Sequence, residues 1–223
     1  AVALFRPRRV VVAWDGGRSA WRRSVYPGYK VRARSGRPDL TDCYAQRPVV
    51  RDLLTVFGVG QLEVAGVEAD DLIAWLAVDE RFADRAPSVI LSTDRDYYQL
   101  VGDGVSVYCG VGSVAAHVTA ATFAASAGKS SPAEWHAYRI VNGDASDAIP
   151  RVTGLSGEKR WARVYPALRR LGYDGDAVDF FVGRRDVETL GDDPTDPDAE
   201  ICGKLHDCWG FLERNALLMD LRF

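Results

Sequence analysis

The stretch RVVVAWDGG, residues 9–17, joins an apolar run to an acidic residue that follows it directly. A continuous apolar, β-branched run over Arg9–Trp14 is typical of a strand that is covered on both faces in a parallel sheet. The run ends at Asp15, and the two glycines after it favour a turn. The stretch therefore predicts a buried parallel strand that carries a carboxylate at its carboxyl end.

The same pattern continues through the first half of the chain. SVILS, residues 88–92, predicts a second buried strand, and VSVYC, residues 105–109, predicts a third. The periodicity also predicts helices over residues 19–26, 49–57, 68–78 and 94–100. The apolar stripe of the third helix would consist of Leu72, Trp75, Leu76 and either Ala69 or Ile73. This alternation of strands and helices favours an α/β fold with a parallel sheet.

The second half of the chain has a helical pattern. We expect helices over residues 119–127, 132–141, 157–171 and 199–218. Residues 174–200 hold ten acids, which we expect on a solvated loop and helix face. The change in pattern places a boundary between two units, residues 1–115 and residues 116–223.

The composition is that of a globular protein. Of the 223 residues, 47% are hydrophobic and 26% are charged, which excludes a disordered, collagen-like or coiled-coil chain. No stretch approaches the roughly 18 apolar residues that a membrane-spanning helix needs. We therefore expect a cytoplasmic protein that does not act at a membrane.

The charges are unevenly distributed along the chain. Residues 1–37 carry ten Lys and Arg against one acid, which gives +9, and the total of −3 then leaves −12 for the other 186 residues. Such a split indicates a local anion-binding face, although a solvated basic surface remains an alternative.

Eight acids stand at the ends of predicted strands or the starts of predicted helices. They are Asp15; Glu68, Asp70 and Asp71; Asp94 and Asp96; and Asp144 and Asp147. Any one of them alone is more typical of a helix cap. Four such groups at one sheet edge would repel one another, and divalent cations remove that repulsion. Oxygen ligands without His or Cys select Mg²⁺ or Mn²⁺, and the number of acids implies two ions.

Six segments in order resemble the 5′-nuclease family of flap endonucleases and 5′→3′ exonucleases, which includes phage enzymes and the amino-terminal nuclease domain of bacterial DNA polymerase I. The segments are VVVAWDG (10–16), WRRSVYPGYK (21–30), GVEADDLIA (66–74), STDRDYYQL (92–100), VNGDASDAIPRVTGLSGEK (141–159) and RNALLMDL (214–221). The resemblance implies a PIN-like nuclease core with a helical arch at about residues 18–48, followed by a helical DNA-binding subdomain.

The resemblance also implies roles for individual residues. The eight acids match the metal-site acids of the family, and Arg22 and Lys30 match a basic pair at the base of the arch that contacts the scissile phosphate. Arg23, Arg32 and Arg34 would contact DNA nearby. The positive segment 1–37 lies where the arch would be.

A second DNA contact is implied by the segment from Ser146 to Arg160. It resembles the family's helix–three-turn–helix, placed here within about residues 132–171, in which a Gly-rich turn brings backbone N–H groups to a duplex phosphate. The matching residues are Gly154, Ser156, Gly157, Lys159 and Arg160. In relatives K⁺ can bind the backbone carbonyls of this turn, so the resemblance extends to K⁺.

The sequence departs from the family in three places. The family's first metal-ligand Asp lies on a central strand well before the position of Asp15, so we expect a missing amino-terminal segment and a gap in the sheet. The Arg expected shortly after Lys30 is replaced by Ala33, and a Gly in the family's turn is replaced by Arg151.

The leading hypothesis is a structure-selective nuclease, dependent on divalent metal, that cleaves DNA at 5′ ends, nicks or 5′ flaps in replication or repair. We expect a monomer, either a stand-alone enzyme, which the chain's end mildly favours, or one acting with a polymerase. Two alternatives are a non-catalytic module that binds flap DNA and a PIN-type ribonuclease. The turn before Lys159 argues against a small ribonuclease, which would not need a duplex-binding appendage.

Overall fold

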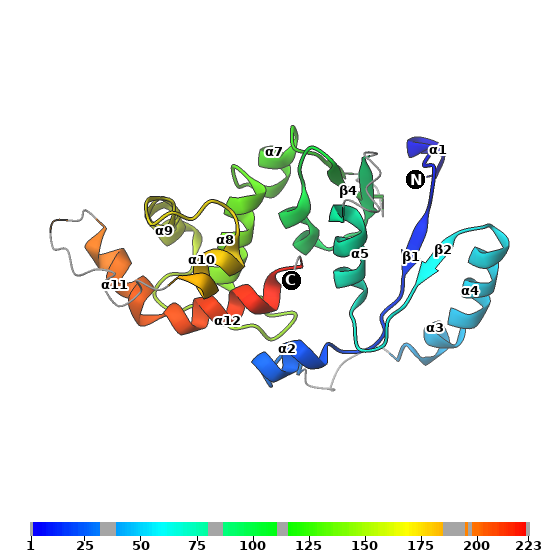
Figure 1. Cartoon of the computed structure of the whole chain (residues 1–223), viewed down its shortest axis with the longest axis horizontal. Coiled ribbons are helices and arrows are strands. Elements are labelled where there is room, and N and C mark those ends of the chain that lie inside the picture. The colour runs from blue at the N-terminus through cyan, green and yellow to red at the C-terminus, as the bar shows by residue number, and fades with distance from the viewer. Residues whose placement is uncertain are drawn as a thin grey trace.

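The computed structural model describes residues 2–31, 39–79, 87–110, 116–184, 195 and 198–221 (Figure 1). Strand β1 (Val11–Ala13) pairs in parallel with β2 (Gly60–Leu62). Strand β3 (Ser88–Leu91) pairs in parallel with β4 (Val105–Cys109), which pairs antiparallel with β5 (Ala116–Val118). The predicted α/β order with parallel strands is confirmed, whereas β2 and β5 were not predicted.

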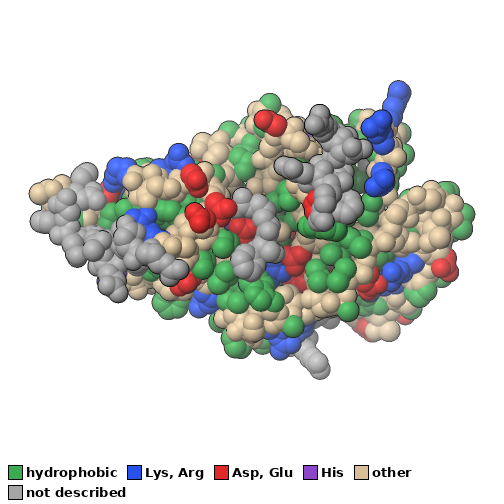
Figure 2. Space-filling view, in the orientation of Figure 1, with side chains coloured by type: hydrophobic (Ala, Val, Ile, Leu, Met, Phe, Trp, Pro, Cys, Tyr) green, Lys and Arg blue, Asp and Glu red, His purple; other side chains and the backbone are tan. Residues whose placement is uncertain are grey.

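The described strands form two separate sheets. The parallel strand predicted over residues 9–14 is confirmed for Val11–Ala13, but the prediction that it is buried is wrong, because Val11 is 40% exposed. In the described part of the chain β1 pairs with β2 alone, so one of its edges lacks a neighbouring strand. Apolar side chains accordingly reach the surface between α5 and β2 (Figure 2).

The helices of the first half surround these strands. They are α1 (Val2–Phe5), α2 (Ala20–Val25), α3 (Thr41–Ala45), α4 (Arg47–Val56) and α5 (Ala69–Val78), with the 3₁₀ helix η1 (Arg95–Leu100) after β3. Ser19 caps α2 by accepting a hydrogen bond from the Arg22 amide, which explains why the helix begins there. α1 and α3 were not predicted.

The apolar stripe expected on α5 is only partly correct. Leu72 is buried, but Trp75 is 41% exposed, and Ala74 and Ala77 are buried in its place. α5 lies against β1, β3 and η1. The small side chains of the alanines allow that close approach. The prediction missed them because it placed large apolar residues on the buried face.

The second half is a helical unit with its own core. It contains α7 (Phe123–Ala127), α8 (Pro132–Asn142), α9 (Glu158–Arg170), α10 (Ala177–Gly183), α11 (Ala199–Asp207) and α12 (Trp209–Met219). Its core is built on fully buried side chains such as Leu155, Val164, Leu168, Ile201 and Leu205. The helix predicted over residues 199–218 is divided at Cys208, and α10 lies within the acid-rich segment that we expected to be loop and solvated helix.

A second apolar cluster joins the two halves of the chain. It combines Ile90 and Val107 of the sheet with Val118, Phe123 and Trp135 from beyond residue 115. Residues 111–115 lie outside the described residues. The division into units at residue 115 stays a prediction, and the shared core means that the two parts pack as neighbours. None of the described helices is long and apolar enough to cross a membrane.

Candidate metal centre

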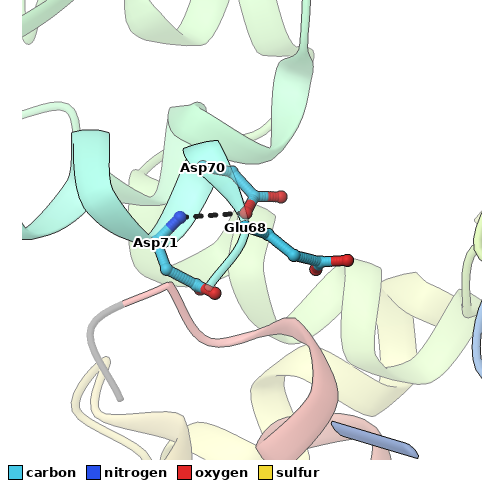
Figure 3. A group of neighbouring side chains, drawn as sticks. All are labelled: Glu68, Asp70 and Asp71. Carbon is cyan, nitrogen blue, oxygen red and sulfur yellow. Dashed lines mark hydrogen bonds between the residues drawn. The ribbon is translucent and has the colours of Figure 1, made fainter. Parts of the chain in front are cut away.

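Three acids stand together at the start of α5. Glu68 occupies the N-cap position, and Asp70 and Asp71 lie in the first turn. One carboxylate oxygen from each lies within 4.8 Å of the others (Figure 3). Asp70 accepts a hydrogen bond from the Asp71 amide at 2.9 Å, as the dashed line in Figure 3 marks. The group offers carboxylate oxygens only, so its chemistry fits Mg²⁺ or Mn²⁺ better than zinc.

Arg22 of α2 is ion-paired with this group from a buried position. Its Nη1 and Nη2 atoms donate to the two carboxylate oxygens of Asp71 at 2.6 and 2.5 Å, and Nη1 lies 3.2 Å from Oε2 of Glu68. Nε donates to the carbonyl of Leu218 in α12 at 2.9 Å. The residue is only 3% exposed. Whether Arg22 contacts a scissile phosphate stays a prediction, because no DNA is part of this structure.

Tyr29 and Lys30 reach the same group from the segment after α2. The Tyr29 hydroxyl donates to Oε2 of Glu68 at 2.7 Å, and Lys30 Nζ lies 3.0 Å from Oε1 of Glu68. Lys30 Nζ also lies 3.6 Å from Oδ2 of Asp147, so it connects the Asp144–Asp147 group to the group at the start of α5. The Lys30 side chain keeps a quarter of its surface exposed, so it lies at the rim of the group.

Asp15 and Asp94 each follow a strand and each act as caps. Oδ1 of Asp15 accepts from the amide of Ala69, the first residue of α5, at 2.9 Å. Oδ1 of Asp94 accepts from the Asp96 amide at 2.9 Å at the start of η1. The capping alternative is therefore correct for both. It uses one oxygen of each carboxylate, and a cap of this kind is compatible with metal ligation through the other oxygen.

Arg139 in α8 connects two further acids. Its Nη2 atom lies 2.7 Å from Oδ1 of Asp96 and 2.5 Å from Oδ2 of Asp144. Sequence reasoning missed this residue. The available signal was a basic side chain in the last turn of the helix that leads into the Asp144 segment, but its pairing with Asp96 depends on how the elements pack.

A tight hairpin holds Asp144 in place. Asp144 and Ile149 exchange backbone hydrogen bonds at 2.9 and 2.8 Å. Gly143 precedes it with φ +66°, and a Cβ built there would lie 2.5 Å from the Ile149 carbonyl oxygen. Only glycine fits this approach, so the GD pair serves the geometry of the acid.

Burial and neighbouring charges shift the pKa values of three acids in the site. Burial, followed by the charge of Asp71, raises the pKa of Asp70 to about 6. Burial also raises the pKa of Asp96 to about 6, although Arg139 opposes the rise. For Asp144 burial is the largest influence and raises the pKa, but the Ser146 hydrogen bonds and Arg139 outweigh it, so the pKa is lowered overall.

Tyr97 links the separate acidic groups. Its side chain is buried, and burial followed by the charges of Asp70, Asp94 and Asp15 raises the pKa of its hydroxyl well above the ordinary value. Charges from three of the four predicted groups therefore raise the pKa of one phenol, and Arg139 and Lys30 contact the fourth group. Lys30 connects Asp147 to Glu68 and Arg139 connects Asp144 to Asp96. Among the described residues, Glu68, Asp70 and Asp71 are the one group of three acids close enough to share an ion, so a single site of all eight acids stays a prediction.

The predicted DNA contacts are only partly described. Arg23, Gly154, Gly157 and Lys159 are exposed, and Ser156 is half-buried. Gly154 and Gly157 have positive φ, of +88° and +100°, as a Gly-dependent turn requires. The Gly157 amide donates to Oδ1 of Asn142, and Arg160 lies 3.8 Å from Glu200. Arg32 and Arg34 lie outside the described residues. All these DNA contacts stay predictions.

Residues 1–128 match the family described as "5'-3' exonuclease, N-terminal resolvase-like domain". The chain belongs to this family. It is 35% identical over 172 residues to the thermostable DNA polymerase I of Thermus aquaticus, covering 73% of this chain and 19% of that protein. It is 33% identical over 177 residues to a 5′-3′ exonuclease of Bacillus subtilis, covering 77% of this chain and 57% of that protein.

The chain thus spans about a fifth of the polymerase and little more than half of the exonuclease. Among solved structures it is similar to a bacteriophage T5 protein crystallised with metal ions, with 21% identity, a TM-score of 0.73 and coverage of 99% of this chain and 78% of that one. A complex of the T5 flap endonuclease with DNA and metal ions gives 19% identity, a TM-score of 0.71 and coverage of 99% and 76%. These likenesses confirm the predicted nuclease fold.

Proposed function

We propose that this chain is the catalytic part of a nuclease that hydrolyses DNA phosphodiesters near a 5′ end, a nick or a 5′ flap. The observation that carries the proposal is the set of ion pairs through Lys30 and Arg139 that joins acids from separate segments, in a chain of this family. The metal-bound and DNA-bound T5 structures support the same reaction class, because they share this fold.

Two divalent cations, Mg²⁺ or Mn²⁺, would be held by these carboxylates, where bound ions activate a water and stabilise the leaving oxygen. Among the described residues Asp15, Asp70 and Asp94 form no ion pair with a basic side chain, so they are the most available direct ligands. The acids that are paired with Arg22 and Arg139 would hold the ions through water. The backbone carbonyls of the turn over residues 154–157 would provide a K⁺ site.

Lys30 is the better placed of the two predicted phosphate contacts. Its ammonium group lies at the rim between Glu68 and Asp147 and retains exposed surface, whereas the guanidinium of Arg22 is enclosed. A cation at this position would neutralise charge that develops on the phosphoryl group. The exposed Arg23 and Lys159 would contact DNA phosphates further away, which makes binding strongly dependent on salt. A polymerase, fused or separate, is the partner that the relatives suggest.

The test compares the intact natural protein that contains this chain with its Asp94→Asn variant. Substrates are flapped, nicked, blunt duplex and single-stranded DNA, each with Mg²⁺ and with chelator. We expect cleavage of the flapped or nicked DNA only with Mg²⁺, and a loss of at least about a hundredfold in Asp94→Asn with flap binding retained. The exposed Asp103, changed to Asn, is the matched control and should leave the rate unchanged.

Three results would contradict the proposal. Cleavage by Asp94→Asn at the unmodified rate would remove the assignment of Asp94 as a metal ligand. Flap binding without any turnover would favour the binding-module alternative. Preferential cleavage of RNA would favour the ribonuclease alternative.

A further inference from the structure

The guanidinium group of Arg22 is bonded on every side. Nε is held by the Leu218 carbonyl of α12, and the two terminal nitrogens are held by Asp71 and Glu68 at the start of α5. Within α2 it is the one buried residue. Arg23, the next residue of the same helix, is exposed. The two adjacent arginines therefore have the same charge but different environments.

The contact with Asp71 is bidentate and uses both carboxylate oxygens. A fork-to-fork pair of this kind is among the strongest hydrogen-bonded ion pairs in proteins. A buried guanidinium needs such partners, because an unpaired buried charge is strongly destabilising. A phosphate could reach Arg22 only if these contacts broke. A divalent cation that bound Asp71 directly would likewise have to displace or share the arginine.

We propose that Arg22 is a positioning residue: it is the internal counter-ion of Asp71 and Glu68, it fixes the start of α5 against α2 and α12, and it competes with divalent cations for Asp71. The competition rests on the proposed function, in which this acidic group binds divalent cations. The positioning role stands on the ion pairs alone.

Asp70, the residue before Asp71, differs from it in its partners. Asp70 lies in the same helical turn but forms no ion pair with a basic side chain of the described residues, and its carboxylate accepts only the Asp71 amide among the bonds recorded there. A cation would therefore bind at Asp70 first and reach Asp71 only against Arg22. Two neighbouring acids thus differ in availability because one arginine is buried beside them.

The experiment uses the intact natural protein, and the probe is Mn²⁺ alone, measured by calorimetry without DNA. Arg22→Gln removes the charge and keeps much of the side-chain volume, and Arg23→Gln is the matched control. Without metal, Arg22→Gln should lower Tm by about 6–12 °C, because Asp71 and Glu68 lose their counter-ion. Its affinity for Mn²⁺ should rise by about tenfold or more, because a positive charge next to the cation is lost. Arg23→Gln should change neither value appreciably.

Unchanged or weaker Mn²⁺ binding in Arg22→Gln would overturn the competition, and an unchanged metal-free Tm would overturn the positioning role. Arg22→Lys gives an independent reading if the Gln variant does not fold. It keeps the charge but loses the bidentate geometry, so Mn²⁺ affinity should rise less than about threefold while Tm still falls. A tenfold rise in Arg22→Lys would contradict the charge argument. These readouts need no cleavage, so an inactive protein would refute the proposed function without deciding this inference.

Discussion

The helical unit and the β1–β2–α4 region differ in how much apolar surface they bury. In the helical unit Leu155, Leu168 and Leu205 are fully enclosed. In β1, β2 and α4 not one residue is fully buried, and Val56 and Phe57 at the end of α4 are 80% and 77% exposed. Because burial of apolar surface is the dominant stabilising contribution, the helical unit contributes more to stability than the β1–β2–α4 region does.

The acids of the helical unit also differ from those of the candidate metal centre. In the helical unit burial acts to raise the pKa of Glu134, but hydrogen bonds from Ser130 and Trp161 outweigh it, so the pKa is lowered. Hydrogen bonds from Tyr138 and Lys129 lower the pKa of Glu158, although burial opposes them. In the candidate metal centre burial raises the pKa of Asp70 and of Asp96. The first set stabilises the fold as anions, whereas the second is assembled at an electrostatic cost that a bound cation would offset.

The largest effect is expected from core truncation. Leu168→Ala in α9 should lower the free energy of unfolding by about 3–4 kcal/mol, because the side chain is fully buried and leaves a cavity. Leu53→Ala in α4 should cost less than about 0.5 kcal/mol, since Leu53 is 52% exposed. Urea unfolding of both variants measures the difference. Equal losses of unfolding free energy in the two variants would contradict the difference in burial between the two regions.

How much of this architecture the sequence predicts depends on local signals. The strands over 88–91 and 105–109 and the helices α8 and α9 were predicted because their apolar runs and periodicities are strong. β2 was missed because GQL offers no apolar run, and its strand character comes from pairing with β1.

The candidate site was predicted to a similar extent. The grouping of Glu68, Asp70 and Asp71 was predicted from their position at a helix start, since that relation is local. The role of all eight acids as metal ligands stays a prediction. The pairing of Arg139 with Asp96 and Asp144 was missed, because it joins α8 to η1 across separate parts of the chain. The burial of Arg22 was missed for the same reason, because it depends on Leu218 at the far end of the sequence.

An intermediate effect is expected from the pH dependence of stability at Asp70 in the candidate metal centre. The folded state raises the pKa of Asp70 from 3.8 to about 6, so it holds this proton more tightly than the unfolded state does. Stability from this group is therefore lost as pH rises from about 4 to about 6. In chelator, Asp70→Asn should match the unmodified protein at pH 4 and exceed its stability at pH 8 by about 1–2 kcal/mol, a figure reduced for partial exposure.

Saturating Mg²⁺ should reverse that order at pH 8, because the cation stabilises the protein that binds it and Asp70→Asn loses a ligand. Thermal unfolding at both pH values, with Mg²⁺ and with chelator, gives the four comparisons. If Asp70→Asn is the less stable protein in chelator at pH 8, then Asp70 is not assembled at an electrostatic cost.

The smallest effect is expected from the helix caps of α8, in the helical unit, and of α2, outside it. Ser131 caps α8 by accepting from the Glu134 amide at 3.1 Å, and Ser19 caps α2 by accepting from the Arg22 amide at 3.1 Å. Each Ser→Ala change removes one capping bond of about 1 kcal/mol. In Ser131→Ala the loss should appear in global unfolding, because α8 forms part of the main core.

In Ser19→Ala the loss should appear mainly as faster amide hydrogen exchange in the first turn of α2, because this turn can fray locally while the Arg22 contacts still hold the helix against α5 and α12. Comparing hydrogen exchange with urea unfolding for the two variants distinguishes local from global loss. A full loss of about 1 kcal/mol in global stability from Ser19→Ala would mean that the first turn of α2 unfolds only together with the helical unit. The Arg22 contacts with α5 and α12 would then extend the cooperative core to the amino-terminal end of α2.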